Sequence, residues 1–276
     1  MGLFDFFKPV SSWTVEEVRT VLRERSAGSY NLVDVRQPGE YESGHLPGAR
    51  LIPIAELGDR LGELDRSKPT ITYCRSGVRS RAAAATLSEA GFLQVHSMAG
   101  GMNAWNGLVA GGAYETGLAY FPHTARAEEM ISLSFALEEG NRVFYDRISR
   151  DVKEEEAASI FRLLGQAEER HKGILRELHA RVSGKGGDPE LPEEMEAGRF
   201  LEGGAPVEET LVRVRGKAVE EILELAIAME ANSLDRYIKM GRAVADERSR
   251  EVFLALSREE QKHLERMTSL LDRLKP

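Results

Sequence analysis

Two ten-residue stretches decide the fold of the C-terminal half: ALEEGNRVFY at residues 136–145 and AMEANSLDRY at residues 228–237. They lie 92 positions apart (228 − 136 = 92), and the same shift places AEERH at 167–171 on EEQKH at 259–263. Apolar residues recur at three- and four-residue spacing through both copies, which is typical of amphipathic helices. The sequence therefore predicts two similar helix pairs, which together make a four-helix bundle.

The repeat keeps acidic and histidine side chains in register. The residues that coincide under the shift and can ligate a metal are Glu138 with Glu230, Glu168 with Glu260, and His171 with His263. Residues three apart share a helix face, so each Glu-x-x-His directs a carboxylate and an imidazole at one point. Four carboxylates inside a bundle repel one another unless cations neutralise them. We expect a site for two metal ions, most simply iron, with manganese or zinc as substitutes.

Weaker interpretations stay open for the neighbouring residues. A single Glu-x-x-His on a helix is usually an exposed surface pair, and only the second copy in register favours a metal site. Glu138 and Glu230 are the lone glutamates, because neither belongs to a Glu-x-x-His pair. Tyr145 and Tyr237 follow them by two helical turns, so they are either hydrogen-bond donors to ligand carboxylates or plain core tyrosines. His179 meets Leu271 under the repeat, and we predict that it lies on the surface.

The two halves of the chain differ in pattern. The C-terminal half predicts helices at about 125–149, 152–182, 207–243 and 247–274, with residues 183–206 as a long crossover link. The N-terminal half alternates short apolar runs with helical stretches, which predicts a parallel α/β sheet with flanking helices. Its expected strands are 31–35, 50–54, 70–74 and 94–98, and its expected helices are 14–25, 54–64 and 78–90. We divide the chain into an α/β domain at 1–112, a linker at 113–124 and an all-α bundle at 125–276.

The single cysteine of the chain, Cys74, ends a predicted strand and opens the loop CRSGVRS directly before a helix. Exposed backbone N–H groups at a helix start, together with Arg75 and Arg79, favour a thiolate or persulfide over a thiol. Gly77 permits the tight turn that points these amides inward. The loop from Arg75 to Arg79, which includes Ser76 and Val78, therefore predicts an anion cradle around a nucleophile. An inert buried cysteine is the simpler alternative.

Composition limits the classes of function. The formal net charge of −8 argues against a nucleic-acid partner, because such binding needs clustered basic residues. One cysteine makes no intramolecular disulfide, which fits a reducing cytoplasm. We find no signal peptide and no apolar run of membrane-spanning length, so we expect no membrane partner.

The helical half resembles the rubrerythrin branch of the ferritin-like superfamily over about residues 125–274, on the repeated motifs quoted above. The resemblance implies a ferritin-like bundle in which the six repeated glutamates and histidines ligate iron, and it implies reduction of hydrogen peroxide. Ser233 stands where rubrerythrins carry an additional glutamate, and one cysteine cannot form the rubredoxin iron site that normally delivers electrons. The electron donor is therefore expected to be a separate, unknown partner.

The N-terminal half resembles the rhodanese family over about residues 11–110. The motifs are LVDVRQPGEYESGHLPGARLIPI at 32–54, CRSGVRS at 74–80 and AGGMNAW at 99–105. The resemblance implies that Cys74 carries sulfane sulfur as a persulfide, and that Asp34 and Arg36 form a structural ion pair near it. His45, in the GHLPGA turn, is expected to be architectural.

These patterns together predict a sulfurtransferase fused to a di-iron carboxylate domain that reduces peroxide or oxidises ferrous iron. Small sulfur donors, thiol acceptors and a second copy of the chain in a homodimer are the expected partners. The alternative is a sulfur- and iron-handling protein whose bundle binds or stores metal without redox turnover. A third interpretation makes the metal a structural staple.

Overall fold

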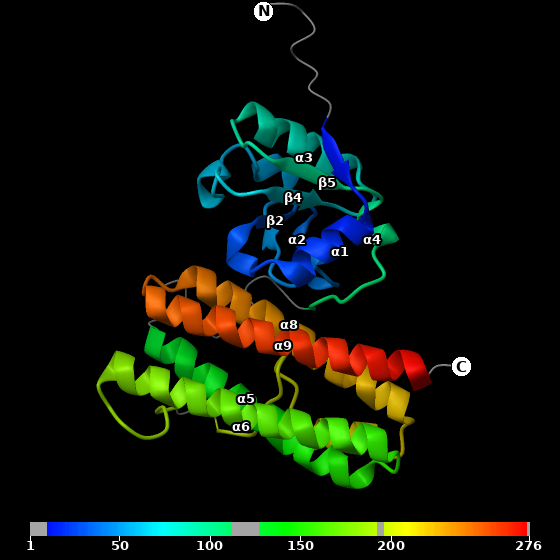
Figure 1. Cartoon of the computed structure of the whole chain (residues 1–276), viewed down its shortest axis with the longest axis vertical. Coiled ribbons are helices and arrows are strands. Elements are labelled where there is room, and N and C mark those ends of the chain that lie inside the picture. The colour runs from blue at the N-terminus through cyan, green and yellow to red at the C-terminus, as the bar shows by residue number, and fades with distance from the viewer. Residues whose placement is uncertain (1–9, 112–126, 192–195, 275–276) are drawn as a thin grey trace, which may run out of the picture. The chain divides into compact units, whose positions relative to one another are not determined.

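The computed structural model of the protein describes residues 10–111, 127–191 and 196–274. The chain falls into two compact units, Met1–Tyr114 and Glu115–Pro276, which Figure 1 draws as an α/β unit and a bundle of long helices. The expected linker at 113–124 lies entirely outside the described residues, so its bounds stay a prediction. No helix in the described ranges is both long and apolar enough to cross a lipid bilayer.

The first unit is built on a parallel sheet whose five described strands have the order β1-β5-β4-β2-β3. The strands are β1 (Ser11–Trp13), β2 (Asn31–Asp34), β3 (Arg50–Leu51), β4 (Thr70–Tyr73) and β5 (Val95–Met98). All four residues of the central strand β4 are buried, as expected of a parallel strand covered on both faces. The predicted parallel α/β fold is confirmed, and β1 is an edge strand that the sequence analysis missed.

Helices and turns connect these strands. They are α1 (Val15–Glu24), η1 (Ala27–Ser29), α2 (Pro38–Glu42), η2 (Ile54–Glu56), η3 (Leu61–Glu63), α3 (Val78–Glu89) and α4 (Gly101–Ala104), where η marks a 3-10 turn. The continuous helix expected at 54–64 is wrong, because only η2 and η3 form there. Gly58 and Gly62 lie in this stretch, and glycine disfavours a continuous helix.

The second unit holds, among its described residues, four long helices and one short one. They are α5 (Ala127–Asp151), α6 (Glu155–Ser183), α7 (Val207–Val214), α8 (Val219–Ala243) and α9 (Glu247–Leu274). α5 packs along α6, and α8 packs along α9, so the bundle consists of two helix hairpins, green and orange to red in Figure 1. The predicted ferritin-like bundle is confirmed.

The single helix expected at 207–243 is interrupted, which is a second correction. Gly216 has a φ of +74°, in the left-handed region that ends helices. α7 therefore ends before this glycine, and α8 starts anew after it.

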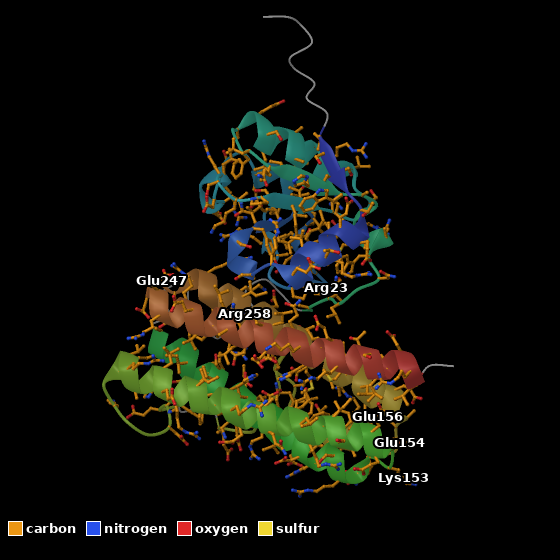
Figure 2. The ribbon with its side chains drawn as sticks, viewed as in Figure 1. Arg23, Lys153, Glu154, Glu156, Glu247 and Arg258 are labelled. Atoms are coloured by element: carbon orange, nitrogen blue, oxygen red, sulfur yellow. The ribbon has the colours of Figure 1, made fainter. Side chains whose placement is uncertain are left out.

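Charged residues divide sharply between the surface of the bundle and its interior. Figure 2 shows Lys153, Glu154 and Glu156 at the end of the bundle where α5 passes into α6, and all three are exposed. In contrast, Glu138 and Glu230 are 0% exposed. Interior acids need compensation that surface acids do not, so the interior is where chemistry is expected.

Candidate functional sites

Cys74 lies at the carboxyl end of the central strand β4, in the turn that leads into α3. Parallel sheets commonly place ligands at this edge. The Gly77 backbone N–H donates a hydrogen bond to the Cys74 Sγ over 3.1 Å. Gly77 has a φ of +91° and is the residue at the start of α3, so its left-handed backbone turns the amide towards the sulfur.

The surroundings of Cys74 favour its thiolate. Burial by itself raises the pKa of the thiol, but hydrogen bonds from the backbone and side chain of Ser80 and from the backbone N–H groups of Ser76 and Gly77 outweigh it. The pKa of Cys74 therefore lies below its ordinary value. A thiolate held by amides at a helix start is a nucleophile with a built anion cradle.

A second glycine-containing turn, at Gly101, packs against the backbone of the cysteine loop. The N–H of Met102 donates to the Cys74 carbonyl and the N–H of Asn103 donates to the Arg75 carbonyl, each over 2.8 Å. A Cβ on Gly101 would lie 2.2 Å from the Cys74 carbonyl oxygen. The glycine in AGGMNAW is thus required by close approach to the cysteine loop.

The two arginines of the loop have different surroundings. Arg75 is exposed, whereas the Arg79 guanidinium donates to both Glu40 carboxylate oxygens over 2.8 Å. The hydrogen bonds from Arg79 lower the pKa of Glu40 to about 2. Sequence reasoning missed Glu40. Its signal was the spacing Gln37-Pro-Gly-Glu40, in which the Glu40 carboxylate also accepts from the Gln37 N–H and caps α2.

Asp34 and Arg36 form a buried ion pair beside the loop. Arg36 Nη2 lies 2.6 Å from Asp34 Oδ2, and it also donates to the Gly44 carbonyl over 2.8 Å. His45 stacks on Tyr41 with ring centroids 3.6 Å apart. These contacts tie the end of β2 to the turn after α2, which is an architectural role.

In the bundle, the six repeated residues converge from four helices. Each of α5, α6, α8 and α9 contributes, and all six side chains are buried. One cluster contains Glu138, Glu168, His171 and Glu260, and the other contains Glu168, Glu230 and His263, with ligand atoms within 4.8 Å of one another in each. Because Glu168 belongs to both clusters, the two form one continuous candidate metal site.

The protein's own hydrogen bonds leave part of this centre unsatisfied. Both carboxylate oxygens of Glu168 and the Oε1 of Glu260 are buried and make no hydrogen bond with the described residues. A single imidazole nitrogen, His171 Nδ1, lies 3.3 Å from Glu168 Oε2 and 3.2 Å from Glu260 Oε1. Such oxygens are costly in a protein interior unless something positive meets them. Carboxylate and imidazole donors suit iron, manganese or zinc, so the residues fit such cations.

The pKa values of two groups in the cluster are raised, which means that the site favours added positive charge. Burial and repulsion from Glu138 hold the pKa of Glu168 well above its usual range. Burial alone lowers the pKa of His263, but hydrogen bonds and charge from Glu230 and Glu260 raise it to about 10. Both shifts favour the protonated form of the group, and a bound cation has to displace such protons.

The two tyrosines cross between the hairpins. Tyr145 on α5 donates to Glu230 Oε1 over 2.5 Å, and Tyr237 on α8 donates to Glu138 Oε1. Both are fully buried, and Tyr145 stacks on Phe161 with a centroid distance of 6.1 Å. Of the two interpretations left open by the sequence, the structure shows donors that are also core residues.

Comparison with known families decides the identity of both units. The rhodanese-like domain family matches residues 17–108, and the rubrerythrin family matches residues 129–199 and 221–276. The chain is a fusion of a rhodanese-like domain and a rubrerythrin domain. The cysteine loop lies within the first, and all six clustered ligand candidates lie within the second.

Relatives of the rhodanese-like domain are found among curated proteins. Thiosulfate sulfurtransferase GlpE of Shewanella oneidensis is 32% identical over 97 residues, which is 35% of this chain and 96% of GlpE. YqhL of Bacillus subtilis, an uncharacterised protein, is 38% identical over 33% of this chain and 75% of its own length. The chain covers only 24% of a third relative, the HTH-type transcriptional regulator Rv0324 of Mycobacterium tuberculosis, at 56% identity. A rhodanese-like domain protein from Staphylococcus aureus of known structure is 31% identical over 35% of this chain and 92% of that protein, with a TM-score of 0.33.

The rubrerythrin domain also contains buried charge that sequence reasoning missed. Arg236 and Glu202 are 3% and 5% exposed and form an ion pair inside the bundle. His179, expected on the surface, is 5% exposed and its Nδ1 has no hydrogen-bond partner among the described residues. It lies eight residues beyond His171 on α6, and it belongs to neither ligand cluster.

Proposed function

We propose that the rhodanese-like domain is a sulfurtransferase that works through a persulfide on Cys74. The observation that carries the proposal is the Cys74 Sγ at the start of α3, accepting the Gly77 N–H while hydrogen bonds lower its pKa. The thiosulfate sulfurtransferase activity named for GlpE supports it. Because GlpE is matched over nearly its whole length, the activity is proposed for the domain.

The reaction takes two balanced displacement steps. The Cys74 thiolate attacks the outer sulfur of thiosulfate, the S–S bond breaks, and sulfite leaves while a cysteine persulfide forms. A nucleophilic acceptor, cyanide or a thiolate, then attacks the terminal sulfur of the persulfide. The S–S bond to Cys74 breaks, the Cys74 thiolate is regenerated, and thiocyanate or a new persulfide is released. A protein or low-molecular-weight persulfide can replace thiosulfate as donor. The loop amides stabilise negative charge on sulfur in both steps.

Replacement of the nucleophile tests this proposal. Cys74→Ser should abolish thiocyanate formation from thiosulfate and cyanide, while the matched variant Arg81→Gln, at an exposed position on α3, should keep it. Retained activity in Cys74→Ser would rule out the assignment. Mass spectrometry of the thiosulfate-treated protein should show one added sulfur atom, and Cys74→Ser should show none.

We also propose that the rubrerythrin domain binds two iron ions and reduces peroxide. Bound ferrous ions would supply the two electrons that convert hydrogen peroxide to water. The carrying observation is the shared cluster of four buried carboxyl groups and two histidines, in which Glu168 and Glu260 have oxygens left over for cations.

The protein's own residues position and shield this chemistry. Tyr145 donates to Oε1 of Glu230, and Tyr237 donates to Oε1 of Glu138. The Oε2 of each glutamate is left facing a histidine. The rings of Phe161 and Phe253 lie against the two tyrosines and exclude water from them. An interior kept dry in this way strengthens the attraction between the acids and cations.

Metal analysis with a peroxide titration tests the second activity. Protein purified anaerobically should contain two iron ions, and its near-ultraviolet absorption should appear with peroxide and bleach on reduction. His171→Gln should lose iron, whereas His179→Gln, a buried histidine on the same helix, should keep it. Stable binding of iron without turnover would instead support a metal-handling role, and binding of zinc alone would support a structural staple.

The fusion itself suggests that persulfide chemistry supplies electrons to the iron centre. Chains cut into two units should then react with peroxide and persulfide more slowly than the intact chain, and equal rates would remove the support for coupling. Homodimer formation, proposed by resemblance to rubrerythrins, is testable by analytical ultracentrifugation.

A further inference from the structure

An arginine lies inside the bundle, directly against one candidate ligand. The Arg236 guanidinium, on α8, donates to Glu138 Oε1 over 3.2 Å and to the Ser134 hydroxyl over 2.6 Å. Glu138 Oε1 also accepts from Tyr237, so two donors hold the same oxygen. The remaining oxygen, Oε2, lies 3.4 Å from His171 Nδ1. Arg236 and Tyr237 together therefore hold one oxygen of Glu138 and leave the other oxygen facing His171.

The crossover segment anchors this arginine. Glu202 accepts from Arg236 Nε over 2.5 Å and from Nη2 over 2.8 Å. The Glu202 backbone N–H donates to Asn141 Oδ1 over 3.1 Å, which docks the segment on α5 one turn beyond Glu138. A Cβ on Gly140 would lie 1.9 Å from the Phe200 carbonyl oxygen, so the segment rests directly on the α5 backbone.

This arrangement has no equivalent in the other half of the centre. The shift of 92 residues places Arg236 on Phe144 (236 − 92 = 144), and phenylalanine has no polar side-chain hydrogen to donate. Glu230 Oε1 accepts from Tyr145, the counterpart of Tyr237, as the repeat requires. The internal symmetry that places the six ligands is therefore broken at Arg236.

We propose that Arg236 is a positioning residue of the metal centre. It fixes Glu138 for metal binding and makes the Glu138–His171 half of the centre different from the Glu230–His263 half. The inference rests on the metal-binding part of the proposed function. It implies that two divalent cations bind in two distinguishable steps, and that Arg236 controls only one of them.

Two opposing effects decide the direction of that control. A cation beside Glu138 repels a metal ion, whereas a carboxylate already held in place loses less freedom when it binds one. Glu202 is a bidentate partner that neutralises the guanidinium charge, so the repulsion is largely cancelled. The positioning effect remains, and loss of Arg236 should weaken metal binding in its half.

Titration of the full chain with Co²⁺, followed by calorimetry and by visible absorption, tests the inference. In Arg236→Gln, one of the two Co²⁺ equivalents should bind about 10- to 100-fold more weakly, and the other should bind as in the wild type. Glu202→Gln should weaken the same step, because it removes the anchor of Arg236 and leaves the guanidinium charge uncompensated beside Glu138. Arg142→Gln is the matched control, because Arg142 pairs with Glu139 and Asp146 and touches none of the six ligand candidates.

The possible outcomes separate the two proposals. Two unchanged equivalents in Arg236→Gln, tighter binding, or an equal loss of both steps would overturn the positioning role while leaving the metal centre intact. Failure of the wild-type chain to take up Co²⁺ would overturn the metal centre and this inference with it. If Arg236→Gln loses its helical circular dichroism, Glu202→Gln decides alone: a selective loss of one step supports the role, and an unchanged titration contradicts it.

Discussion

Removal and return of metal should change the stability of one unit of this chain and not the other. The four carboxyl groups of the centre carry up to four negative charges, and cations that bind only the folded bundle stabilise it by mass action. At a free metal concentration about 100-fold above the dissociation constant, each bound ion contributes about 2.7 kcal/mol, so two contribute about 5.4 kcal/mol. For a domain of this size, that raises the Tm by about 10–20 °C.

The chain has a built-in probe for each unit. Its two tryptophans, Trp13 and Trp105, both lie in the rhodanese-like domain, so tryptophan fluorescence follows that domain alone. Far-ultraviolet circular dichroism is dominated by the long helices α5, α6, α8 and α9. Addition of Co²⁺ to the apoprotein should therefore raise the dichroism transition and leave the fluorescence transition in place.

Glu168→Gln sharpens the test. Burial and repulsion from Glu138 raise the pKa of the Glu168 carboxyl and so favour its neutral form, which the amide of glutamine resembles in shape and charge. Glu168→Gln should therefore unfold within about 1 kcal/mol of the wild-type apoprotein. The same variant should lose the stabilisation by metal, while Glu169→Gln, at the half-exposed neighbouring position, should keep it. An unchanged dichroism transition, an equal rise in both transitions, or a full metal response in Glu168→Gln would refute the reasoning.

Three further predictions concern the cysteine loop. Cys74 attacks as a thiolate, so the rate of sulfur transfer should rise with pH to a plateau, and the midpoint of the rise should lie below the ordinary thiol pKa. Ser80→Ala removes a hydrogen bond that stabilises the thiolate and should move this midpoint upward by about one pH unit. Glu40→Gln should lower the free energy of unfolding of the rhodanese-like domain by about 0.5–1 kcal/mol, because a half-exposed ion pair is lost, and an unchanged urea midpoint by tryptophan fluorescence would contradict this. Gly101→Ala should cost about 1–3 kcal/mol in the same assay because its Cβ meets a carbonyl oxygen, whereas Gly39→Ala, in open space, should be tolerated.

The sequence was sufficient to bring the six ligand candidates together because their placement depends on two simple periodicities. The spacing of three residues places the glutamate and the histidine of each Glu-x-x-His pair on one helix face, and the repeat of 92 residues predicts the same arrangement in the second hairpin. Both are local rules that need no knowledge of packing. The position of Cys74 was predictable for the same reason, because the strand before it and the glycine after it fix the loop.

The partners that tune these sites were not predictable from such rules. Glu40 reaches Arg79 across 39 positions, and Arg236 reaches Glu138 across 98, so these contacts exist only once the units have folded. Arg236 also departs from the repeat, because it meets Phe144 under the shift, so the symmetry of the sequence does not indicate it. Only burial, seen in the structure, separates Arg236 from the many exposed arginines of the helices.

The expected helix at 54–64 failed for a related reason. Its apolar spacing suits a helix, but Gly58 and Gly62 weaken it, and the two short turns place Leu57 and Leu64 in the core instead. The sequence pattern gives the positions that must be buried. The path of the backbone between them is decided by packing.

Because each tyrosine donates its hydrogen bond to a glutamate of the opposite hairpin, each helix hairpin depends on the other. In a hairpin of α5 and α6 alone, Glu138 would lack the hydrogen bond from the Tyr237 phenol. In a hairpin of α8 and α9 alone, Glu230 would lack the one from Tyr145. Two identical hairpins placed face to face would supply each other by the same exchange, so the single polypeptide preserves within itself the reciprocity of a twofold dimer. Hairpins produced as separate fragments should accordingly reassemble with one another, each completing what the other lacks.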